Sequence, residues 1–244
     1  MDFTLHNVQW TDDKTDRFWN VVYEHFVTDN TFANAAARGL LRVTRHVIPP
    51  EGRVLDYGTG KGHLIEVLLK CFRGAIEIYG CDCSQQSCQS VNHAFGHDKR
   101  FKTCYVSSCR QSPLLSGFFD VVFLTEVIEH LGEEQLRDTM REIRRLIKHG
   151  GVIILTCPNN EDIQAKSVLC PDCGAMFHPV QHVRRFNCFD LERTMKDFAY
   201  TAISCKPYYL AYHTRKSMKT IIRNIYYSVL KKDKPNLVYI GRAI

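Results

Sequence analysis

The sequence predicts an α/β domain in which one doubly wound parallel sheet is covered by helices on both faces. Three observations lead to this prediction. Strand and helix patterns alternate from residue 53 onward, three alternating glycines follow the first strand, and an acidic residue ends the second strand. Alternating strands and helices form parallel sheets through right-handed crossovers. A chain of 244 residues is long enough for one such domain and too short for two large ones.

The expected elements follow from hydrophobic periodicity. Helix-type repeats predict helices near residues 62–71, 84–95, 133–148 and 190–198, and strand-type runs predict parallel strands near 53–57, 75–81, 101–106, 119–125 and 151–156. Two later extended segments, 201–209 and 236–241, predict an antiparallel hairpin at one edge of the sheet. Ligands of such sheets bind outside the carboxyl ends of the strands, so we expect the functional site there.

The stretch from Arg53 to Lys70 reads as a strand, a tight turn and a helix, with Gly58, Gly60 and Gly62 in the turn. Glycine accepts positive φ and leaves no Cβ between the backbone and a ligand. The free N–H groups at the start of the next helix attract a carboxylate or a phosphate. The spacing is neither G-x-G-x-x-G nor a loop ending in Gly-Lys-Ser/Thr, which disfavours a dinucleotide fold and a phosphate loop.

This stretch resembles motif I of the class I S-adenosylmethionine-dependent methyltransferases, an apolar strand followed by Asp-x-Gly-x-Gly-x-Gly. Residues 75–82, 118–131 and 146–159 resemble three further strands of that family in the same order. The resemblance implies a Rossmann-like, seven-stranded sheet, mostly parallel with an antiparallel C-terminal edge strand. It assigns residues 1–50 to an N-terminal helical cap and 51–244 to the methyltransferase domain.

The same resemblance implies S-adenosylmethionine as the cofactor. Asp82 would accept hydrogen bonds from both ribose hydroxyls, and the glycines would admit the methionine part of the cofactor. Ser108 or Cys109 would lie near the adenine. The expected cofactor-binding residues are Asp56, Tyr57, Gly58, Thr59, Gly60, Gly62, Asp82, Cys83, Ser108, Cys109 and Thr125.

A Cys/His-rich insert at residues 165–188 contains Cys170-Pro-Asp-Cys173-Gly, a pattern typical of a zinc knuckle. His178 and His182 are the expected remaining zinc ligands, with Cys188 as a further candidate. The histidines follow the cysteines more closely than in a normal structural site. A redox pair and two free cysteines therefore remain alternatives.

A second segment with ligand chemistry is Glu126-Val-Ile-Glu129-His130, after the predicted strand 119–125. If the segment is helical, all three polar side chains can converge on a divalent ion. In the small-RNA 3′-terminal 2′-O-methyltransferases a Glu-x-x-Glu-His segment and a downstream histidine hold such an ion, which implies His182 as the fourth ligand. In the similar, metal-independent ubiquinone-pathway O-methyltransferases the segment lines the cofactor pocket. Candidates for proton transfer are His182, His130 and Glu126.

Two amphipathic regions flank the domain. Phe18, Trp19 and the aromatic residues Tyr23 and Phe26 give one apolar helix face, and we expect most of them to pack on the sheet. A second helix is expected from Ala33 to Val47, before Pro49-Pro50. A basic amphipathic helix at 215–232 either makes a peripheral membrane or polyanion contact or packs on the domain with a solvated face.

The composition argues against several classes of protein. No apolar run approaches the roughly 20 residues of a membrane span, and the start of the chain lacks a basic leader or an apolar signal core, so a cytoplasmic location is expected. Eleven cysteines, several of them in predicted strands, indicate free thiols rather than a disulfide framework. A net charge of +6 gives only mild attraction to anionic partners.

The resulting hypothesis is a methyltransferase that acts on an oxygen nucleophile of a small molecule or a glycan, with nitrogen and carbon less favoured. The overall layout is similar to bacterial methyltransferases of surface-glycan and secondary-metabolite clusters. One alternative is a metal-dependent RNA ribose 2′-O-methyltransferase that uses Glu126, Glu129, His130 and His182. The other is a catalytically silent, cofactor-binding interaction module stabilised by zinc.

Overall fold

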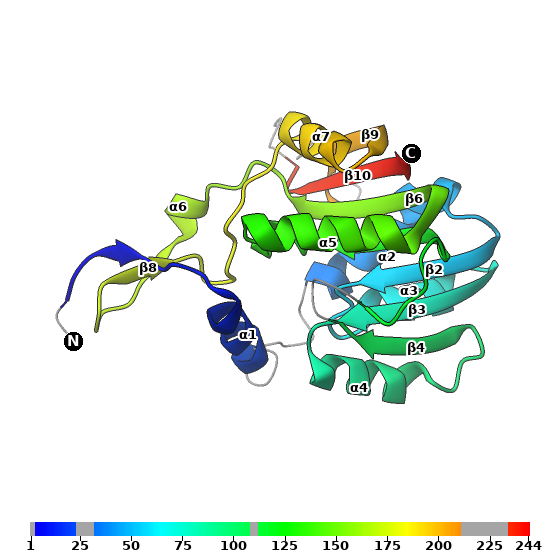
Figure 1. Ribbon diagram of the computed structural model, residues 1–244, viewed down its shortest axis with the longest axis horizontal. Coiled ribbons are helices and arrows are strands. Elements are labelled where there is room, and N and C mark those ends of the chain that lie inside the picture. The colour runs from blue at the N-terminus through cyan, green and yellow to red at the C-terminus, as the bar shows by residue number, and fades with distance from the viewer. Residues whose placement is uncertain (1–2, 23–31, 108–111, 211–233) are drawn as a thin grey trace, which may run out of the picture.

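A computed structural model describes residues 3–22, 32–107, 112–210 and 234–244, with the side chains of residues 32–35 excepted. Its centre is a seven-stranded sheet in the order β4-β3-β2-β5-β6-β10-β9 (Figure 1). These strands are β2 (Glu51–Tyr57), β3 (Ala75–Asp82), β4 (Phe101–Val106), β5 (Phe119–Thr125), β6 (Ile147–Pro158), β9 (Tyr200–Tyr208) and β10 (Asn236–Ala243). The predicted fold class is confirmed.

Strand β2 lies at the point where the strand order reverses. It pairs in parallel with β3 on one side and with β5 on the other. The chain runs outward from β2 through β3 to β4 and then returns to place β5 beside β2. In open α/β sheets this switch point is where ligands bind, beyond the carboxyl ends of the strands.

The predicted C-terminal hairpin is confirmed. Strand β10 pairs antiparallel with both β6 and β9. The antiparallel strand itself therefore lies between β6 and β9, and β9 forms the outer edge of the sheet.

Helices cover both faces of the sheet because successive strand residues point to opposite sides. On β2, Val54 belongs to one buried cluster and Leu55 to the other. The first cluster packs under α2 (Phe32–Thr44), α3 (His63–Cys71) and α4 (Gln85–Phe95), and the second under α5 (Glu133–Leu146) and α7 (Cys188–Asp197). Figure 1 shows α5 in front of the sheet and α2 and α3 behind it.

Most helix bounds agree with the sequence prediction, and the differences have local causes. Helix α5 ends at Leu146, because the chain is already extended at Ile147, where β6 begins. The expected helix from Ala33 to Val47 is α2 followed by a short 3-10 turn, Arg45–Val47. The first helix, α1, spans Asp12–Val21, where Thr11 accepts a hydrogen bond from the backbone N–H of Lys14. Tyr23, Phe26 and the predicted helix at 215–232 lie outside the described residues.

The Cys/His-rich insert forms a feature that the sequence did not predict. After the short helix α6 (Ile163–Lys166), strands β7 (Val168–Leu169) and β8 (Ala175–Phe177) form a hairpin, and β1 (His6–Asn7) pairs in parallel with β8. We call residues 3–8 and 167–177 the arm. In Figure 1 the arm projects from the side of the main sheet, with α1 between the two.

Within the described part of the chain, no helix is long and apolar enough to cross a membrane. The ten cysteines of that part are all free thiols.

Candidate functional site

A cavity of about 500 Å³ opens at the carboxyl ends of the central strands, between α1 and α5. Its size lies within the range of small-molecule and cofactor pockets. We call it the sheet-end cavity. It is lined by Asp12, Thr15, Asp16, Trp19, Asn20, Tyr57, Gly58, Cys81, Asp82, Cys83, Ser84, Val106, Ser107, Glu126, Val127, His130, Leu131, Glu134, Gln135 and Asp138.

The glycine turn, residues 56–62, is fastened to the end of the neighbouring strand β3. The N–H of Gly58 donates to the carbonyl of Cys81 (2.8 Å), and the Thr59 hydroxyl accepts from the N–H of Cys81 (3.1 Å). All three glycines have positive φ, at 82°, 53° and 76° for Gly58, Gly60 and Gly62. A Cβ on Gly58 would come within 2.5 Å of the Val127 side chain. The turn therefore requires glycine for its backbone shape and for its close approach to Val127.

Asp82 closes the same turn from β3. One carboxylate oxygen accepts from the N–H of Gly60 (2.8 Å) and the other from the N–H of Ser84 (2.9 Å). The side chain is buried and lines the sheet-end cavity, and burial raises its pKa. Each oxygen keeps a further acceptor site, so a pair of ribose hydroxyls fits this carboxylate.

Asp56, at the end of β2, is almost fully buried. No hydrogen-bond partner for its Oδ1 is present among the described residues. Burial, together with the charge of Asp82, raises the pKa of Asp56 to about 7. An orphaned buried carboxylate oxygen fits a cationic partner such as an ammonium group. The two aspartates and the glycine turn therefore suit the S-adenosylmethionine that the sequence implies.

The structure distributes the other predicted cofactor residues unevenly. Tyr57 and Cys83 line the cavity, as Gly58 and Asp82 do, whereas Thr59, Gly60 and Gly62 shape the turn behind it. Thr125, at the end of β5, does not line the cavity. Ser108 and Cys109 lie outside the described residues. Among the lining residues that sequence reasoning missed are Ser84 and Val106, although Ser84 begins a predicted helix and Val106 ends a predicted strand.

The far end of the cavity is built from α1, α5 and the segment after β5. The Trp19 indole N–H donates to Oε1 of Gln181 (2.8 Å), and its ring packs edge-to-face on His130 with centroids 4.9 Å apart. Gln135 on α5 donates to Asp12 on α1 (2.8 Å), which joins the two helices across the cavity. Trp19 therefore lines the cavity wall, and the expectation that most of these aromatic residues pack on the sheet stays a prediction, since Tyr23 and Phe26 lie outside the described residues.

Glu126 faces the same end of the cavity. Its φ is +51°, and its N–H donates to the carbonyl of Thr156 (3.0 Å), which holds the strained backbone in place. Its Oε1 is buried, with no hydrogen-bond partner in the described part of the chain. Burial, and secondarily the charge of Glu161, raises the pKa of Glu126 to about 7. A carboxylate with these properties is suited to accept a proton near neutral pH.

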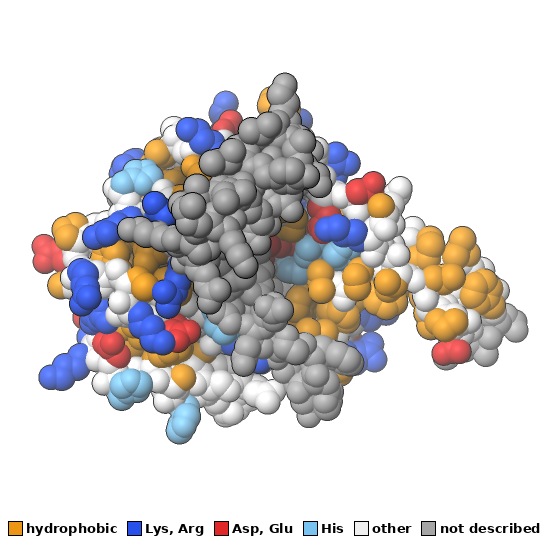
Figure 2. Space-filling model, turned by 180° about the vertical axis from the view of Figure 1, so that it is seen from behind, with side chains coloured by type: hydrophobic (Ala, Val, Ile, Leu, Met, Phe, Trp, Pro, Cys, Tyr) orange, Lys and Arg blue, Asp and Glu red, His pale blue; other side chains and the backbone are white. Residues whose placement is uncertain are grey.

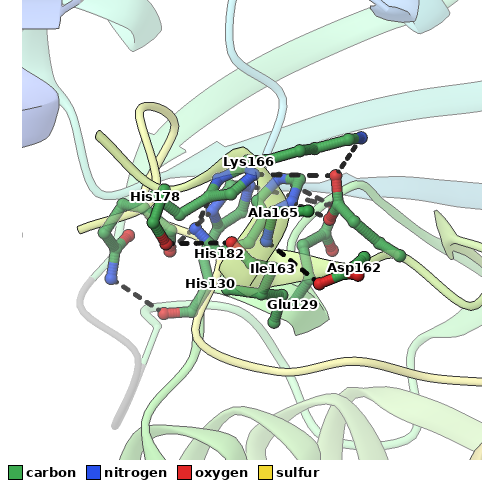
Figure 3. Close-up of polar contacts among 11 residues, drawn as sticks. Glu129, His130, Asp162, Ile163, Ala165, Lys166, His178 and His182 are labelled. Carbon is green, nitrogen blue, oxygen red and sulfur yellow. Dashed lines mark hydrogen bonds and ion pairs between the residues drawn. The ribbon is translucent and has the colours of Figure 1, made fainter. Parts of the chain in front are cut away.

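Behind this wall lies a buried group of charged and aromatic side chains that we call the acid–histidine cluster: Glu129, His130, Glu161, His178 and His182 (Figure 3). Three separate segments supply it, namely the 3-10 turn Ile128–His130, the loop after β6 and the loop after β8. The Glu129 carbonyl accepts from the N–H groups of Val183 (2.9 Å) and Arg184 (3.2 Å), which ties two of the segments together.

Hydrogen bonds fix the protons on His182. Its Nδ1 contacts Glu161, whose other oxygen accepts from Lys166 (2.6 Å). Burial alone would raise the pKa of Glu161, but Lys166 and His182 hold it below its usual range, so Glu161 is an acceptor. Nδ1 of His182 therefore donates to Glu161, and its Nε2 lies 4.0 Å from Oε1 of Glu129.

His130 is arranged in the same way. Its Nδ1 lies 3.4 Å from the backbone carbonyl of Gln181, which only accepts, so Nδ1 carries the proton. Its Nε2 then presents a lone pair, 3.9 Å from Oε1 of Glu129. Burial, and next the neighbouring His182, lowers the pKa of His130 to about 3, so the ring is neutral at pH 7.

Glu129 therefore faces Nε2 of both rings and has no hydrogen-bond donor among the described residues. Its side chain is 1% exposed, and both carboxylate oxygens lack a partner among the residues that the structure describes. Burial and the charge of Glu126 raise its pKa well above the usual range. One carboxylate oxygen and two imidazole nitrogens, each ring oriented through its other nitrogen, are a ligand set typical of a divalent ion.

A second grouping, Glu161 with His178 and His182, does not have this property. The N–H of His182 donates to Nδ1 of His178 (3.3 Å). Neutral His178 then carries its proton on Nε2, which lies 3.6 Å from Glu161. Burial, followed by the charge of His182, lowers the pKa of His178, consistent with a neutral ring. A protonated Nε2 has no lone pair and cannot coordinate a metal.

The predicted zinc set of Cys170, Cys173, His178 and His182 is not brought together. Within the described ranges, the groups that could hold a metal contain neither cysteine. The cysteines lie in the β7–β8 turn of the arm, whereas His178 and His182 turn back toward Glu161. The further candidate, Cys188, lies on α7, where its thiol contacts the carbonyl of Cys205 (3.4 Å).

The three predicted proton-transfer residues do not all lie at the cavity. Glu126 and His130 line the cavity, and His182 lies behind them. Sequence reasoning missed Glu161 and Gln181. The only signal for Glu161 was its position in the loop after the predicted strand 151–156, at the edge of the sheet where ligands bind. Nothing in the sequence singled out Gln181, which contacts both Trp19 and His130.

Comparisons with known proteins agree with the fold and its cavity. A family model described as a methyltransferase domain matches residues 23–204. No curated protein matches the chain significantly. Solved structures are similar over nearly the whole chain, at low identity.

A putative sarcosine dimethylglycine methyltransferase from Galdieria sulphuraria has a TM-score of 0.64 at 13% identity and covers 93% of this chain and 97% of its own. The 1,6-didemethyltoxoflavin-N1-methyltransferase of Burkholderia thailandensis, solved with S-adenosylhomocysteine, has a TM-score of 0.63 at 14% identity, with 98% and 94% covered. A SAM-dependent methyltransferase from Aquifex aeolicus has a TM-score of 0.61 at 13% identity, with 97% and 100% covered. These likenesses show the fold.

Proposed function

Because the chain belongs to the methyltransferase domain family, we propose that it transfers the methyl group of S-adenosylmethionine to an oxygen nucleophile of a small molecule or a glycan. The observation that carries this proposal is the two-ended cavity. One end is lined by Gly58 and Asp82, and the other by Glu126, whose Oε1 is buried without a partner among the described residues. The cofactor supplies a methyl group on a positively charged sulfonium, which is already a reactive electrophile.

At the cofactor end, Asp82 holds the ribose hydroxyls and Asp56 accepts from the ammonium group. Support comes from the remaining acceptor capacity of Asp82 and the orphaned oxygen of Asp56. Cys83 and Ser107 line the same end of the cavity, beside the expected adenine position. Ser108 and Cys109 remain predictions from the sequence.

At the acceptor end, Glu126 removes the proton from the acceptor hydroxyl. A hydroxyl, unlike a neutral amine, must lose its proton to become a good nucleophile, and a base is most effective when its pKa lies near the working pH. The raised pKa of Glu126, about 7, meets this condition. Trp19 and His130 form the wall that keeps water away and holds the acceptor in line with the sulfonium.

His182 contributes indirectly. Its ring orients Glu161 and faces Glu129, so it supports the wall and does not touch the acceptor. We therefore propose Glu126 as the proton acceptor, His130 as a wall residue, and His182 as a positioning residue.

A second candidate is metal-dependent methylation of an RNA ribose, and the ligand set of Glu129, His130 and His182 favours it. A different observation argues against an RNA acceptor. The cavity is lined by six acidic residues and by no Lys or Arg of the described chain: Asp12, Asp16, Asp82, Glu126, Glu134 and Asp138. Such a wall repels a polyanion, whose binding relies on Lys and Arg at its phosphates. A divalent ion remains compatible with a hydroxylated small molecule.

The test is transfer of an isotope-labelled methyl group by the full-length protein to matched acceptors: hydroxylated small molecules, glycans, primary amines and RNA 3′ ends. Each is assayed with a chelator and with added Mn²⁺, and fragmentation locates the label. The proposal expects label on an oxygen of a small molecule or glycan. Label on nitrogen contradicts it, and Mn²⁺-dependent label on RNA ends supports the second candidate. If the protein binds the cofactor but transfers the methyl group to no acceptor, the result supports the catalytically silent interaction module.

A further inference from the structure

The arm carries a cysteine pair that the sheet-end cavity does not use. Cys170 and Cys173 lie at its tip, in the turn between β7 and β8. We infer that this tip is half of a zinc site, and that the same two cysteines of a second copy of the chain complete it. The resulting tetrathiolate site would join two arms into a dimer. The inference stands on the arm alone and does not depend on the proposed methyl acceptor.

The turn has the shape of a metal knuckle before any metal is bound. The N–H of Cys170 donates to the carbonyl of Ala175 (2.8 Å), and the N–H of Gly174 donates back to the carbonyl of Cys170 (3.0 Å). Gly174 has φ +76°, and a Cβ there would come within 2.5 Å of the Thr4 carbonyl on the adjoining strand. Only glycine fits that position, so the turn is shaped to hold its two cysteines.

Cys170 and Cys173 are both free thiols, separated by two residues in one tight turn. Thiolates, not thiols, bind zinc, and Cys-x-x-Cys turns commonly supply two of its ligands. Both residues are partly exposed, so an ion reaches them from solvent.

The pair is incomplete by itself. Structural zinc takes four ligands in a tetrahedron. No other Cys, His, Asp or Glu of the described chain joins these two thiols in a group of three, and the nearby His178 and His182 are engaged with Glu161. A two-fold contact presents the same patch from both subunits. Two cysteines from each copy then give four thiolates around one ion.

The surface around the turn fits a second copy. Large apolar side chains are exposed on the strands beside it: Phe3 (57%), Leu5 (61%), Val168 (42%) and Leu169 (49%). Figure 2 shows hydrophobic side chains gathered on the projecting arm. Exposed apolar patches of this kind mark protein interfaces. A symmetric contact buries this patch on both arms.

The binding step needs no oxidant or reductant. Four thiols lose four protons to solvent, and four sulfur–zinc bonds form. With four thiolates around one Zn²⁺, the site carries a net charge of −2. Formation of the dimer is therefore favoured by zinc and opposed by acid and by chelators.

The experiment measures mass and zinc content of the full-length protein by light scattering and native mass spectrometry. We expect a dimer with half a zinc per chain that separates into zinc-free monomers on chelation and re-forms when zinc is returned. Cys173→Ser should be monomeric and zinc-free, with a far-UV circular dichroism spectrum like wild type. Cys71→Ser, which removes an exposed thiol on α3, is the matched control and should remain a zinc dimer.

Cobalt substitution gives a second readout. It uses the wild-type protein, so it remains informative if the Cys173→Ser variant folds poorly. In the wild-type protein, the thiolate charge-transfer absorption per cobalt should be that of four sulfur ligands. One zinc per monomeric chain would overturn the inference, because the site would then be completed within one chain. A Cys170–Cys173 disulfide in zinc-free protein purified without oxidant would overturn it as well, and so would a dimer that persists in Cys173→Ser.

Discussion

The glycine turn and the acid–histidine cluster lie at neighbouring strand ends, but they satisfy their polar groups in opposite ways. In the turn, both oxygens of Asp82 and the Thr59 hydroxyl accept backbone N–H bonds from within the fold. In the cluster, Glu129 is buried with two oxygens that have no partner among the described residues and that face Nε2 of two imidazole rings. The turn leaves one carboxylate oxygen of Asp56 without a partner in the described chain, whereas in the cluster both oxygens of Glu129 lack one.

This difference separates the tasks of the two regions. A preformed cradle binds its ligand at little reorganisation cost, as expected of a cofactor site. A buried group of unsatisfied acceptors costs free energy until a cation or proton enters, which is the usual condition of functional sites with perturbed pKa values. The following predictions, ordered from the largest expected effect, test whether the contrast holds.

Glu126→Gln removes the proposed proton acceptor at the edge of the cluster and should lower kcat/KM by about 10²–10⁴-fold, with little change in cofactor affinity. In the wild-type protein, kcat/KM should rise with pH and level off above about 7, where Glu126 loses its proton. The variant should lack this rise. Steady-state kinetics from pH 5 to 9 measure it, with the exposed Glu51→Gln as control. A variant with wild-type rates would remove Glu126 from the mechanism.

Glu129→Gln tests whether the cluster receives a cation. In chelator the variant should be more stable than wild type by about 1–4 kcal/mol, increasingly so at higher pH, because wild type must ionise a buried carboxylate without a partner. Added Mn²⁺ or Zn²⁺ should raise the Tm of wild type but not that of the variant. At a hundredfold excess of the ion over Kd, the free energy of unfolding of wild type should increase by about 2.7 kcal/mol.

Thermal unfolding with and without each ion gives both values. An ion that stabilises the two proteins equally, or neither of them, would show that the cluster is not an ion site. In that case a proton on Glu129, and not a bound cation, would be what the cluster needs and the glycine turn does not.

Asp56→Asn tests the unsatisfied carboxylate at the cofactor end. Because the pKa of Asp56 rises from 3.8 to about 7 on folding, the folded protein holds a proton that the unfolded chain has lost between these values. Wild-type stability therefore falls as the pH rises through this window, by roughly 4 kcal/mol at most from this residue. The variant should lack that decrease. Urea unfolding at pH 4, 5.5 and 7 measures the difference, and parallel pH curves would refute the assignment.

Trp19→Phe should have the smallest effect. It removes the indole N–H that donates to Gln181 and leaves that oxygen without its donor, at a cost of about 1 kcal/mol. A double-mutant cycle with Gln181→Leu isolates the interaction, and a coupling energy near zero would mean that the hydrogen bond does not hold α1 against the cluster.

The sheet and the glycine turn were predictable because their signals are local. Each strand carries its apolar residues in a short run or in alternation, and the turn lies within seven residues that carry their own glycines. The C-terminal hairpin was predictable for the same reason. The position of β10 between β6 and β9 depends on its pairing with β6. Neither segment of the hairpin carries a sequence signal for that pairing.

The arm and the acid–histidine cluster were not predictable because long-range pairing creates them. Strand β1 has only two residues and exists because His6 pairs with Ala175. Glu161 and Gln181 become site residues only when three loops meet at His130 and His182. The zinc prediction treated sequence proximity of cysteines and histidines as spatial proximity, and the hairpin of the arm separates them.

The most direct test of the central claim is calorimetric titration of S-adenosylmethionine into chelator-treated wild-type protein and into Asp82→Ala. The account predicts saturable binding at one site per chain in wild type. Loss of the hydrogen bonds to the ribose should weaken binding by about 100-fold in the variant, equivalent to about 3 kcal/mol. No binding to folded wild type, or equal affinity for both proteins, would contradict the assignment of the sheet-end cavity to this cofactor.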